Sequence, residues 1–221
     1  MAGILYCIGT GPGDPELMTV KAVKTLEGCS IIAAVRASGR EAALSIARGA
    51  VSLHNKPIIH IDLPMKNPAR SYDRAAEALC RALLSGDAAL LCLGDASLYA
   101  SAVRLCKRVR ARGYAVKVVP GVPSFCAMAA AAGIPLAMGD TPLQILPYGC
   151  EDFAERLKLS GAKIVMKCGA HMDALCDLLD ELGLLDKAYG AENVGTDGER
   201  IYQDLRSAKD CGYFTTVYIA G

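Results

Sequence analysis

Three glycines, two prolines and one aspartate follow the first apolar stretch of the chain. Residues 9–15 read Gly-Thr-Gly-Pro-Gly-Asp-Pro, directly after the apolar run 4–8. A glycine loop that closes a strand binds a phosphate when free backbone N–H groups point to it from a helix N-terminus. Here the spacing is G-x-G-x-G, where a dinucleotide fingerprint has G-x-G-x-x-G, and Pro12 and Pro15 have no N–H group. At about 4 Å, the carboxylate of Asp14 and a phosphate would repel each other by roughly 1–4 kcal/mol.

This loop is therefore a poor phosphate site, and two interpretations remain open. It is either a tight strand-to-helix turn in which Asp14 accepts hydrogen bonds from turn amides, or one wall of a cleft for an uncharged or cationic group. Two further glycine loops follow apolar stretches, Gly94-Asp95-Ala96-Ser97-Leu98-Tyr99 after 88–93 and Pro120-Gly121-Val122-Pro123-Ser124-Phe125 after 115–119. Because loops at the carboxyl ends of parallel strands surround the ligand crevice, we expect these three loops to face one crevice.

Strands and helices alternate along the chain, which is typical of an α/β protein. Apolar spacing and turn signals predict helices over 19–26, 41–51, 70–84, 98–112, 124–132, 151–159 and 172–182, with Thr19 as the N-cap of the first. They predict strands over 4–8, 30–35, 57–61, 88–93, 115–119, 143–146, 163–167, 188–193, 200–205 and 214–219. The last strands are expected to be antiparallel, because the turns 196–198 and 210–212 are too short for crossover helices. We place an N-terminal α/β lobe at 1–120 and a C-terminal α/β lobe at 121–221.

Composition excludes several classes of protein. The net charge of the 221 residues is +1, with basic and acidic residues interspersed, so neither nucleic acid nor an anionic membrane is an expected partner. The ten cysteines include no C-x-x-C pair, so we predict no metal site and expect most of them to be buried thiols in a reducing cytosol. No stretch is apolar for the roughly 18 to 20 residues of a spanning helix, and no signal-type segment opens the chain. We expect a cytoplasmic protein.

Five ordered motifs resemble one known family. Gly9-Thr-Gly-Pro-Gly-Asp-Pro-Glu-Leu-Met-Thr-Val-Lys-Ala, Leu93-Gly-Asp-Ala-Ser-Leu-Tyr, Val119-Pro-Gly-Val-Pro-Ser-Phe, Gly133-Ile-Pro-Leu and Val165-Met-Lys are similar, in order and spacing, to the tetrapyrrole (corrin/porphyrin) methylases. The resemblance covers essentially the whole chain. Within the family, segments 63–65, 145–147 and 213–215 look most like the branch that methylates C(20) of precorrin-2 or cobalt-factor II in cobalamin biosynthesis. The chain departs from the family at Ala96, where proline is usual, and at Pro123, where serine or threonine is usual.

The resemblance implies a fold, a cofactor and a set of contacts. The family fold, that of the class III methyltransferases, has two α/β lobes with the active site and S-adenosylmethionine in the cleft between them, usually in a homodimer. A sulfonium donor without phosphate agrees with acid-bearing loops that lack a Walker lysine. Carried over by position, the cofactor-binding residues would be Pro12, Leu93, Gly94, Asp95, Leu98, Pro123, Ser124, Met166, Thr215 and Thr216.

Methyl transfer from a sulfonium to carbon is a displacement with a neutral leaving group, so positioning supplies most of the catalysis. A base need only remove a proton from the attacked carbon of the macrocycle. The residues leave this base unassigned, with His171, Tyr99 and Asp14 as candidates, while His54 and His60 are interpreted as surface or strand-end residues. A polycarboxylated tetrapyrrole requires cations, and loops after strands offer Arg36, Arg40, Lys66 and Arg70.

Three other functions stay open at this point. One is a tetrapyrrole methylase of the same pathway that methylates another ring position. A second is an NADP-dependent oxidoreductase in which Arg36 contacts the 2′-phosphate, against which the glycine spacing and Asp14 argue. The third is a ligand-binding or regulatory domain without catalysis.

Overall fold

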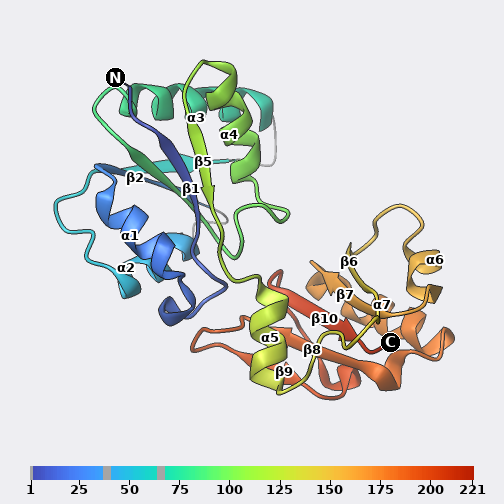
Figure 1. Ribbon diagram of the computed structural model, residues 1–221. Coiled ribbons are helices and arrows are strands. Elements are labelled where there is room, and N and C mark those ends of the chain that lie inside the picture. Colours follow the sequence, from blue (N-terminus) through green and yellow to red (C-terminus); the bar gives the residue numbers. More distant parts are fainter. Residues whose placement is uncertain (1, 37–40, 64–67) are drawn as a thin grey trace. The chain divides into compact units, whose positions relative to one another are not determined.

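The computed structural model describes residues 2–36, 41–63 and 68–221 of the chain. It divides into two compact units, Met1–Pro123 and Ser124–Gly221, so the division falls three residues beyond the expected boundary at 120/121. Figure 1 shows each unit as a sheet with helices packed against it. Each unit is described by itself below.

Unit 1 contains a five-stranded parallel sheet. Its strands are β1 (Leu5–Gly9), β2 (Ile31–Arg36), β3 (Ile58–Asp62), β4 (Ala88–Cys92) and β5 (Val116–Val119), in the spatial order β3-β2-β4-β1-β5. The helices are α1 (Val20–Gly28), α2 (Ala42–Ala50), α3 (Pro68–Ala82) and α4 (Ala102–Ala111), with a short 3-10 helix, η1, at Pro15–Leu17. Every residue of β4 is buried, as a strand covered on both faces requires.

The strand order of unit 1 creates a switch point between β1 and β4. Buried residues of α1 and α2 pack with one face of the sheet, and buried residues of α3 and α4 pack with the other. The chain thus leaves β1 across one face toward β2, and leaves the neighbouring β4 across the opposite face toward β5. In open α/β sheets the ligand crevice lies outside the carboxyl ends of the strands at such a point. The loops after β1, β4 and β5 follow three neighbouring strands there.

Unit 2 contains a mixed sheet in the order β6-β7-β10-β8-β9. Its strands are β6 (Leu143–Pro147), β7 (Ala162–Met166), β8 (Ala188–Glu192), β9 (Arg200–Tyr202) and β10 (Thr215–Ile219). Its helices are α5 (Ser124–Ala132), α6 (Phe153–Lys158) and α7 (Met172–Glu181), with 3-10 helices η2 (Gly169–His171), η3 (Leu185–Lys187) and η4 (Leu205–Ser207). One apolar core joins α7 to one face of this sheet, whereas α5 packs near β9 and β10.

Local chemistry explains two of the element boundaries. Thr19 is the N-cap of α1, as predicted, because its hydroxyl accepts a hydrogen bond from Ala22 N at 3.0 Å. The helix predicted to begin at Leu98 begins instead at Ala102, because Tyr99 has a left-handed backbone conformation (φ 51°) that no α-helix continues. The strand predicted over 200–205 ends at Tyr202, and Leu205 opens η4 instead.

The antiparallel pairing predicted near the C-terminus is confirmed, with an arrangement that the turn lengths did not indicate. β8 pairs with β9, and β10 is antiparallel to both β7 and β8. β10 therefore inserts between two strands rather than pairing with β9, which precedes it in the chain. Six of the ten cysteines are buried and all ten are free thiols, which confirms the expectation that most are buried. Within the described ranges, no helix is both long and apolar enough to cross a membrane.

Candidate functional site

Three glycines bring the three loops of unit 1 into backbone contact. Gly9 ends β1, Gly94 follows β4, and Gly121 follows β5. A Cβ atom on Gly9 would lie 2.7 Å from Gly121 N and 2.7 Å from Gly94 O, and one on Gly121 would lie 2.8 Å from Gly9 C. Contacts this short leave no space for a side chain at either position. The loops therefore meet backbone against backbone at the carboxyl edge of the sheet.

Hydrogen bonds fix the first two loops to each other. Gly11 and Gly94 form an isolated antiparallel bridge, in which Gly94 N donates to Gly11 O at 2.8 Å and Gly11 N donates to Gly94 O at 3.3 Å. Both glycines have left-handed backbones, with φ of 78° and 69°. The fully buried Thr10 donates its backbone N–H and its hydroxyl to Cys92 O, at 2.9 and 3.1 Å. The glycine loop is thus joined to the end of β4 across the switch point.

Asp95 holds the third loop in place. One of its carboxylate oxygens accepts from Ser97 N at 2.8 Å and from the Ser97 hydroxyl, and the other accepts from Gly121 N at 2.9 Å. Burial alone would raise the pKa of Asp95, but these hydrogen bonds outweigh it and hold the pKa below its ordinary value. Asp95 is therefore a charged clamp between the loops after β4 and β5, a role that the Gly-Asp pattern did not reveal.

Asp14 caps a turn. Its carboxylate accepts from Glu16 N at 2.8 Å and forms the N-cap of η1, as in the turn interpretation of the loop. Pro12 is partly exposed and lies between the buried Gly11 and Gly13. In the β4 loop, Leu93 and Leu98 are partly exposed, Ala96 is buried and Tyr99 is 44% exposed. Alanine fits at the position where proline is usual in the family.

A second group of the predicted residues comes together in unit 2. Ser124, the first residue of α5, has its hydroxyl 3.4 Å from that of Thr216, and Thr216 is the cross-strand partner of Met166. Thr215 is 1% exposed and donates its hydroxyl to Gly212 O at 2.8 Å. Successive residues of a strand face opposite sides, so Thr216 shares a face with Met166 and Thr215 does not. Pro123 is the last residue of unit 1.

The candidate base in unit 2 is His171, which is exposed. Its ring stacks on Tyr148 with centroids 4.8 Å apart and an interplanar angle of 10°, and Phe153 packs edge-on against Tyr148. Tyr148 follows β6, and its N–H donates to Met166 O at 2.8 Å. His171 is thereby placed near the carboxyl end of β7, beyond Met166.

The predicted substrate cations differ in their surroundings. Arg36 forms ion pairs with Asp62 at 3.4 Å and with Glu41 at 3.7 Å, and Glu41 also bonds His60 Nδ1 at 2.5 Å. The guanidinium of Arg36 is thus already neutralised by two carboxylates. Arg70 is exposed on α3. Arg40 and Lys66 lie outside the described residues.

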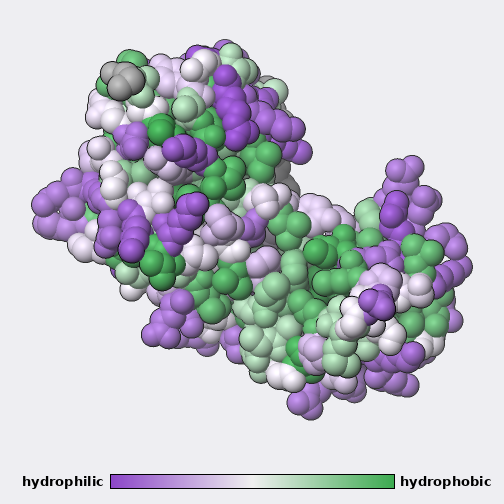
Figure 2. Space-filling model, viewed as in Figure 1, coloured by the Kyte–Doolittle hydropathy of each residue, from purple (hydrophilic) through white to green (hydrophobic). Residues whose placement is uncertain are grey.

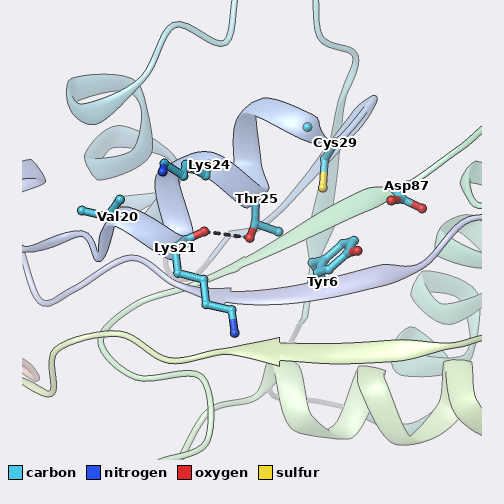
Figure 3. A pocket seen from close by; sticks show the side chains of 8 residues that line it. Tyr6, Val20, Lys21, Lys24, Thr25, Cys29 and Asp87 are labelled. Atoms are coloured by element: carbon cyan, nitrogen blue, oxygen red, sulfur yellow. Dashed lines mark hydrogen bonds between the residues drawn. The ribbon is translucent and has the colours of Figure 1, made fainter.

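One hollow of unit 1, of about 520 Å³, contains none of the predicted site residues. Figure 3 shows its lining from β1 and α1, with Tyr6 below Thr25 and to the right of Lys21, and Asp87 farther to the right. Lys117 lies over the ring of Tyr6, 5.8 Å from its centroid. The hollow lies beside α1 and away from the three glycine loops, so we do not assign the chemistry to it. Elsewhere in the described parts of the chain, no group of three or more His, Cys, Asp or Glu side chains could hold a metal ion.

The architecture, a parallel α/β unit followed by a mixed α/β unit, defines a class of proteins with solved members. Uroporphyrin-III C-methyltransferase from Thermus thermophilus, solved with S-adenosylhomocysteine, matches 99% of this chain and 92% of its own with a TM-score of 0.73 at 19% identity. That likeness, at this identity, concerns the fold, and it confirms the predicted fold class.

Sequence comparison gives the family. The model of the family described as Tetrapyrrole (Corrin/Porphyrin) Methylases matches residues 4–209. Precorrin-2 C(20)-methyltransferase of Sinorhizobium sp is 32% identical over 99% of this chain and 96% of its own length. Cobalt-precorrin-2 C(20)-methyltransferase of Salmonella typhimurium is 29% identical over 99% of this chain and 97% of its own. The chain belongs to the tetrapyrrole methylase family. The resemblance inferred from the five motifs is confirmed, and the oxidoreductase and non-catalytic alternatives are set aside.

Proposed function

We propose that the protein transfers a methyl group from S-adenosylmethionine to C(20) of precorrin-2 or of cobalt-factor II, in the assembly of the cobalamin ring. The observation that carries this proposal is the match along nearly the full length of both chains to a precorrin-2 C(20)-methyltransferase. The loops of unit 1 agree with such a donor, because they present backbone groups, prolines and carboxylates, and a sulfonium is cationic and carries no phosphate.

The donor site is proposed to use both groups of residues described above. The donor contacts proposed in the loops after β1 and β4 are Pro12, Leu93, Gly94, Asp95 and Leu98. Those proposed farther along the chain, also from the sequence resemblance, are Pro123, Ser124, Met166, Thr215 and Thr216. In the first group Asp95 would act through the loops, since its oxygens already accept from Ser97 and Gly121. In the second, Thr216 and Met166 would contact the adenine, and Thr215 would support them from the opposite face.

Catalysis is proposed to depend on orientation. The methyl group moves in line from sulfur to the attacking carbon, and the sulfur leaves as a neutral thioether, so no acid or metal is needed to stabilise a leaving group. The residues of this chain would fix the donor conformation, exclude water and accept one proton from the ring carbon. Well-positioned reactants of this kind lower a barrier by about 7–11 kcal/mol relative to a bimolecular reaction in water.

His171 and Tyr99 are the proposed groups for that proton, in preference to Asp14. The carboxylate of Asp14 is committed to the Glu16 N–H, whereas the His171 ring is exposed and oriented by its stack on Tyr148. For the acceptor's carboxylates, Arg70 is favoured over Arg36, because two acids already neutralise Arg36. Arg40 and Lys66 remain proposals on their sequence positions alone.

The test is a product analysis with defined acceptors. The purified protein is incubated with S-adenosylmethionine and either metal-free precorrin-2 or cobalt-factor II, and the product is examined by mass spectrometry and by NMR with a ¹³C-methyl donor. We expect a gain of one methyl group at C(20), and the faster acceptor identifies the natural metal state. A methyl group at another ring carbon would refute the regiochemistry. Calorimetric binding of NADPH but not of the donor would refute the whole proposal.

We also propose that the protein acts as a homodimer in the cytoplasm. Helix α5 supports the first part, because it carries no charged side chain and its exposed positions include Cys126, Ala130 and Ala131. Figure 2 shows the surface over α5 as mostly apolar. Light scattering coupled to size-exclusion chromatography gives the mass of the particle, and a mass of 23.2 kDa at micromolar concentration would rule the dimer out.

A further inference from the structure

A buried carboxylate at the end of β8 lies beside the residues proposed for the adenine. Glu192 is 3% exposed and is the direct cross-strand partner of Thr215 in β10. One of its carboxylate oxygens accepts from Gly212 N at 2.6 Å. The other accepts from the guanidinium of Arg200 and, at 3.4 Å, from the hydroxyl of Tyr202. A buried charge of this kind is stable only because each oxygen has a partner.

Gly212 connects the Glu192 carboxylate to the start of β10. Its carbonyl accepts the hydroxyl of Thr215 at 2.8 Å, so Glu192, Gly212 and Thr215 form a closed set of contacts. The same carbonyl lies against Gly169, where any Cβ atom would collide with it. Gly212 is therefore held from three sides, by Glu192, by Thr215 and by the backbone before α7.

The segment held in this way carries two exposed aromatic side chains. Tyr213 is 63% exposed and Phe214 is 47% exposed, and their rings meet edge to face with centroids 5.4 Å apart. Two residues before this segment, Asp210 has a left-handed backbone (φ 52°), and at its end Phe214 O accepts from Asn193 N at 3.2 Å. Little apolar burial fixes residues 212–214, so their position depends on polar contacts to the end of β8.

We propose that Glu192 is a positioning residue for the methyl donor. It fixes Gly212 and thereby sets the start of β10, where Thr215 and Thr216 follow directly. The proposal rests on the proposed function, because it assumes that β10 contacts the donor. Removal of the carboxylate takes away one of the three contacts that hold Gly212, and so loosens residues 212–214 and the start of the strand. The consequence is weaker donor binding, with little change in turnover once donor is saturating.

Matched substitutions test this through the binding of S-adenosylhomocysteine, measured by calorimetry well below the melting temperature. Glu192→Ala removes both acceptors, and we expect its dissociation constant to rise at least tenfold. Glu192→Gln keeps one oxygen for Gly212 N, and we expect a value within threefold of the parent. Tyr202→Phe removes the 3.4 Å contact to Glu192, together with the weak 3.7 Å bond from Cys211 Sγ, and should match the parent because Gly212 N keeps its acceptor. If Glu192→Ala does not fold, Gly212→Ala replaces it in the test. Its Cβ atom would lie 2.9 Å from Glu192 Oε1 and would disturb the same contact from the other side.

A second readout follows the segment itself. The chain contains no tryptophan, so Tyr213→Trp introduces a single tryptophan whose fluorescence can be excited selectively. We expect Glu192→Ala to lower the fluorescence anisotropy of this reporter and Glu192→Gln to restore it. In steady-state assays the donor KM should rise at least tenfold in Glu192→Ala while kcat changes less than twofold.

The outcomes separate this inference from the proposed function. Tight binding by the parent together with an unchanged dissociation constant in Glu192→Ala would overturn the role of Glu192. A loss of stability without any change in binding or anisotropy would do the same, since that is what a purely structural role gives. Failure of the parent itself to bind S-adenosylhomocysteine would overturn the proposed function instead.

Discussion

Gly9→Ala tests whether the donor site depends on backbone contact among the three loops of unit 1. The added Cβ atom would lie 2.7 Å from both Gly121 N and Gly94 O, whereas ordinary contacts begin at 3.4 Å. The two neighbouring loops would each have to move by about 0.7 Å, and neither contact atom belongs to a side chain that could rotate away. Overpacking in a close-packed interior costs about 1–3 kcal/mol, and we place this substitution at the upper end, about 3 kcal/mol.

Gly113→Ala is the matched control for this substitution. Gly113 has a left-handed backbone (φ 86°) at the end of α4, and a Cβ atom there would meet nothing within 4 Å. Its replacement should cost about 1–2 kcal/mol of stability through backbone strain alone. Gly9 has no such conformational requirement, so its entire cost is steric.

Urea unfolding followed by circular dichroism measures the first effect, and calorimetry with S-adenosylhomocysteine measures the second. We expect Gly9→Ala to lose more stability than Gly113→Ala and to weaken binding more than tenfold, which is about 1.4 kcal/mol. Gly113→Ala should bind as the parent does. The reasoning is refuted if Gly9→Ala binds S-adenosylhomocysteine with unchanged affinity, because the loops could then separate without consequence for the donor.

Four further substitutions address single residues. Asp95→Ala should weaken donor binding at least tenfold by calorimetry, and equal affinity would count against the clamp. Hydrogen bonds lower the pKa of Asp95, so the stability that it contributes is complete above its ordinary pKa of about 3.9 and is lost as the pH falls through the lower pKa of the folded state. The variant should therefore lose less unfolding free energy than the parent on acidification. Thr215→Val leaves Gly212 O without its 2.8 Å hydrogen bond and should lower the unfolding free energy by about 1–3 kcal/mol. The nearly isosteric Thr216→Val should affect donor affinity more than stability. If urea unfolding and calorimetry instead show that Thr216→Val costs the stability and Thr215→Val the affinity, the assignment of the two faces is contradicted. Burial and the charge of Lys187 lower the pKa of Lys163 in the folded protein. Stability should therefore rise as the pH increases from this lowered pKa to the ordinary lysine pKa of about 10.4. Lys163→Met should abolish that rise and increase the urea midpoint at pH 7.

The sequence was most informative where one local rule decides the structure. Alternating apolar runs and turn residues predicted the order of elements, and Thr19 was correctly placed as a helix cap. Glycines after three strands predicted that their loops share an edge, since parallel strands end on the same side of a sheet. Where two local rules competed, prediction failed. Leu98 to Arg112 has helical spacing, yet the left-handed Tyr99 delays α4 to Ala102.

Contacts between distant residues were beyond sequence reasoning. The bond from Gly121 N to Asp95 joins residues 26 apart and exists only because β4 and β5 flank β1, an order that no local pattern encodes. The position of β10 between β7 and β8 is of the same kind, and it is what places Glu192 opposite Thr215. A glutamate at the end of a predicted strand gave no sign of burial, because its partners are supplied by β9 and by the segment before β10.

The two units share one principle of construction, in which a carboxylate holds a loop that the proposed donor would touch. Asp95 accepts from Gly121 N in unit 1, and Glu192 accepts from Gly212 N in unit 2. Each carboxylate has one oxygen bound to the backbone N–H of the loop it holds, and its other oxygen already accepts from Ser97 in the case of Asp95 or from Arg200 and Tyr202 in the case of Glu192, so neither is free to act as the base. Charge-assisted hydrogen bonds to backbone N–H groups are about twice as strong as neutral ones, and they restrict loops that have little apolar burial. For a displacement whose leaving group departs neutral, fixing the loops contributes more than placing a charge beside the reacting carbon, which is why both carboxylates can be used for positioning alone.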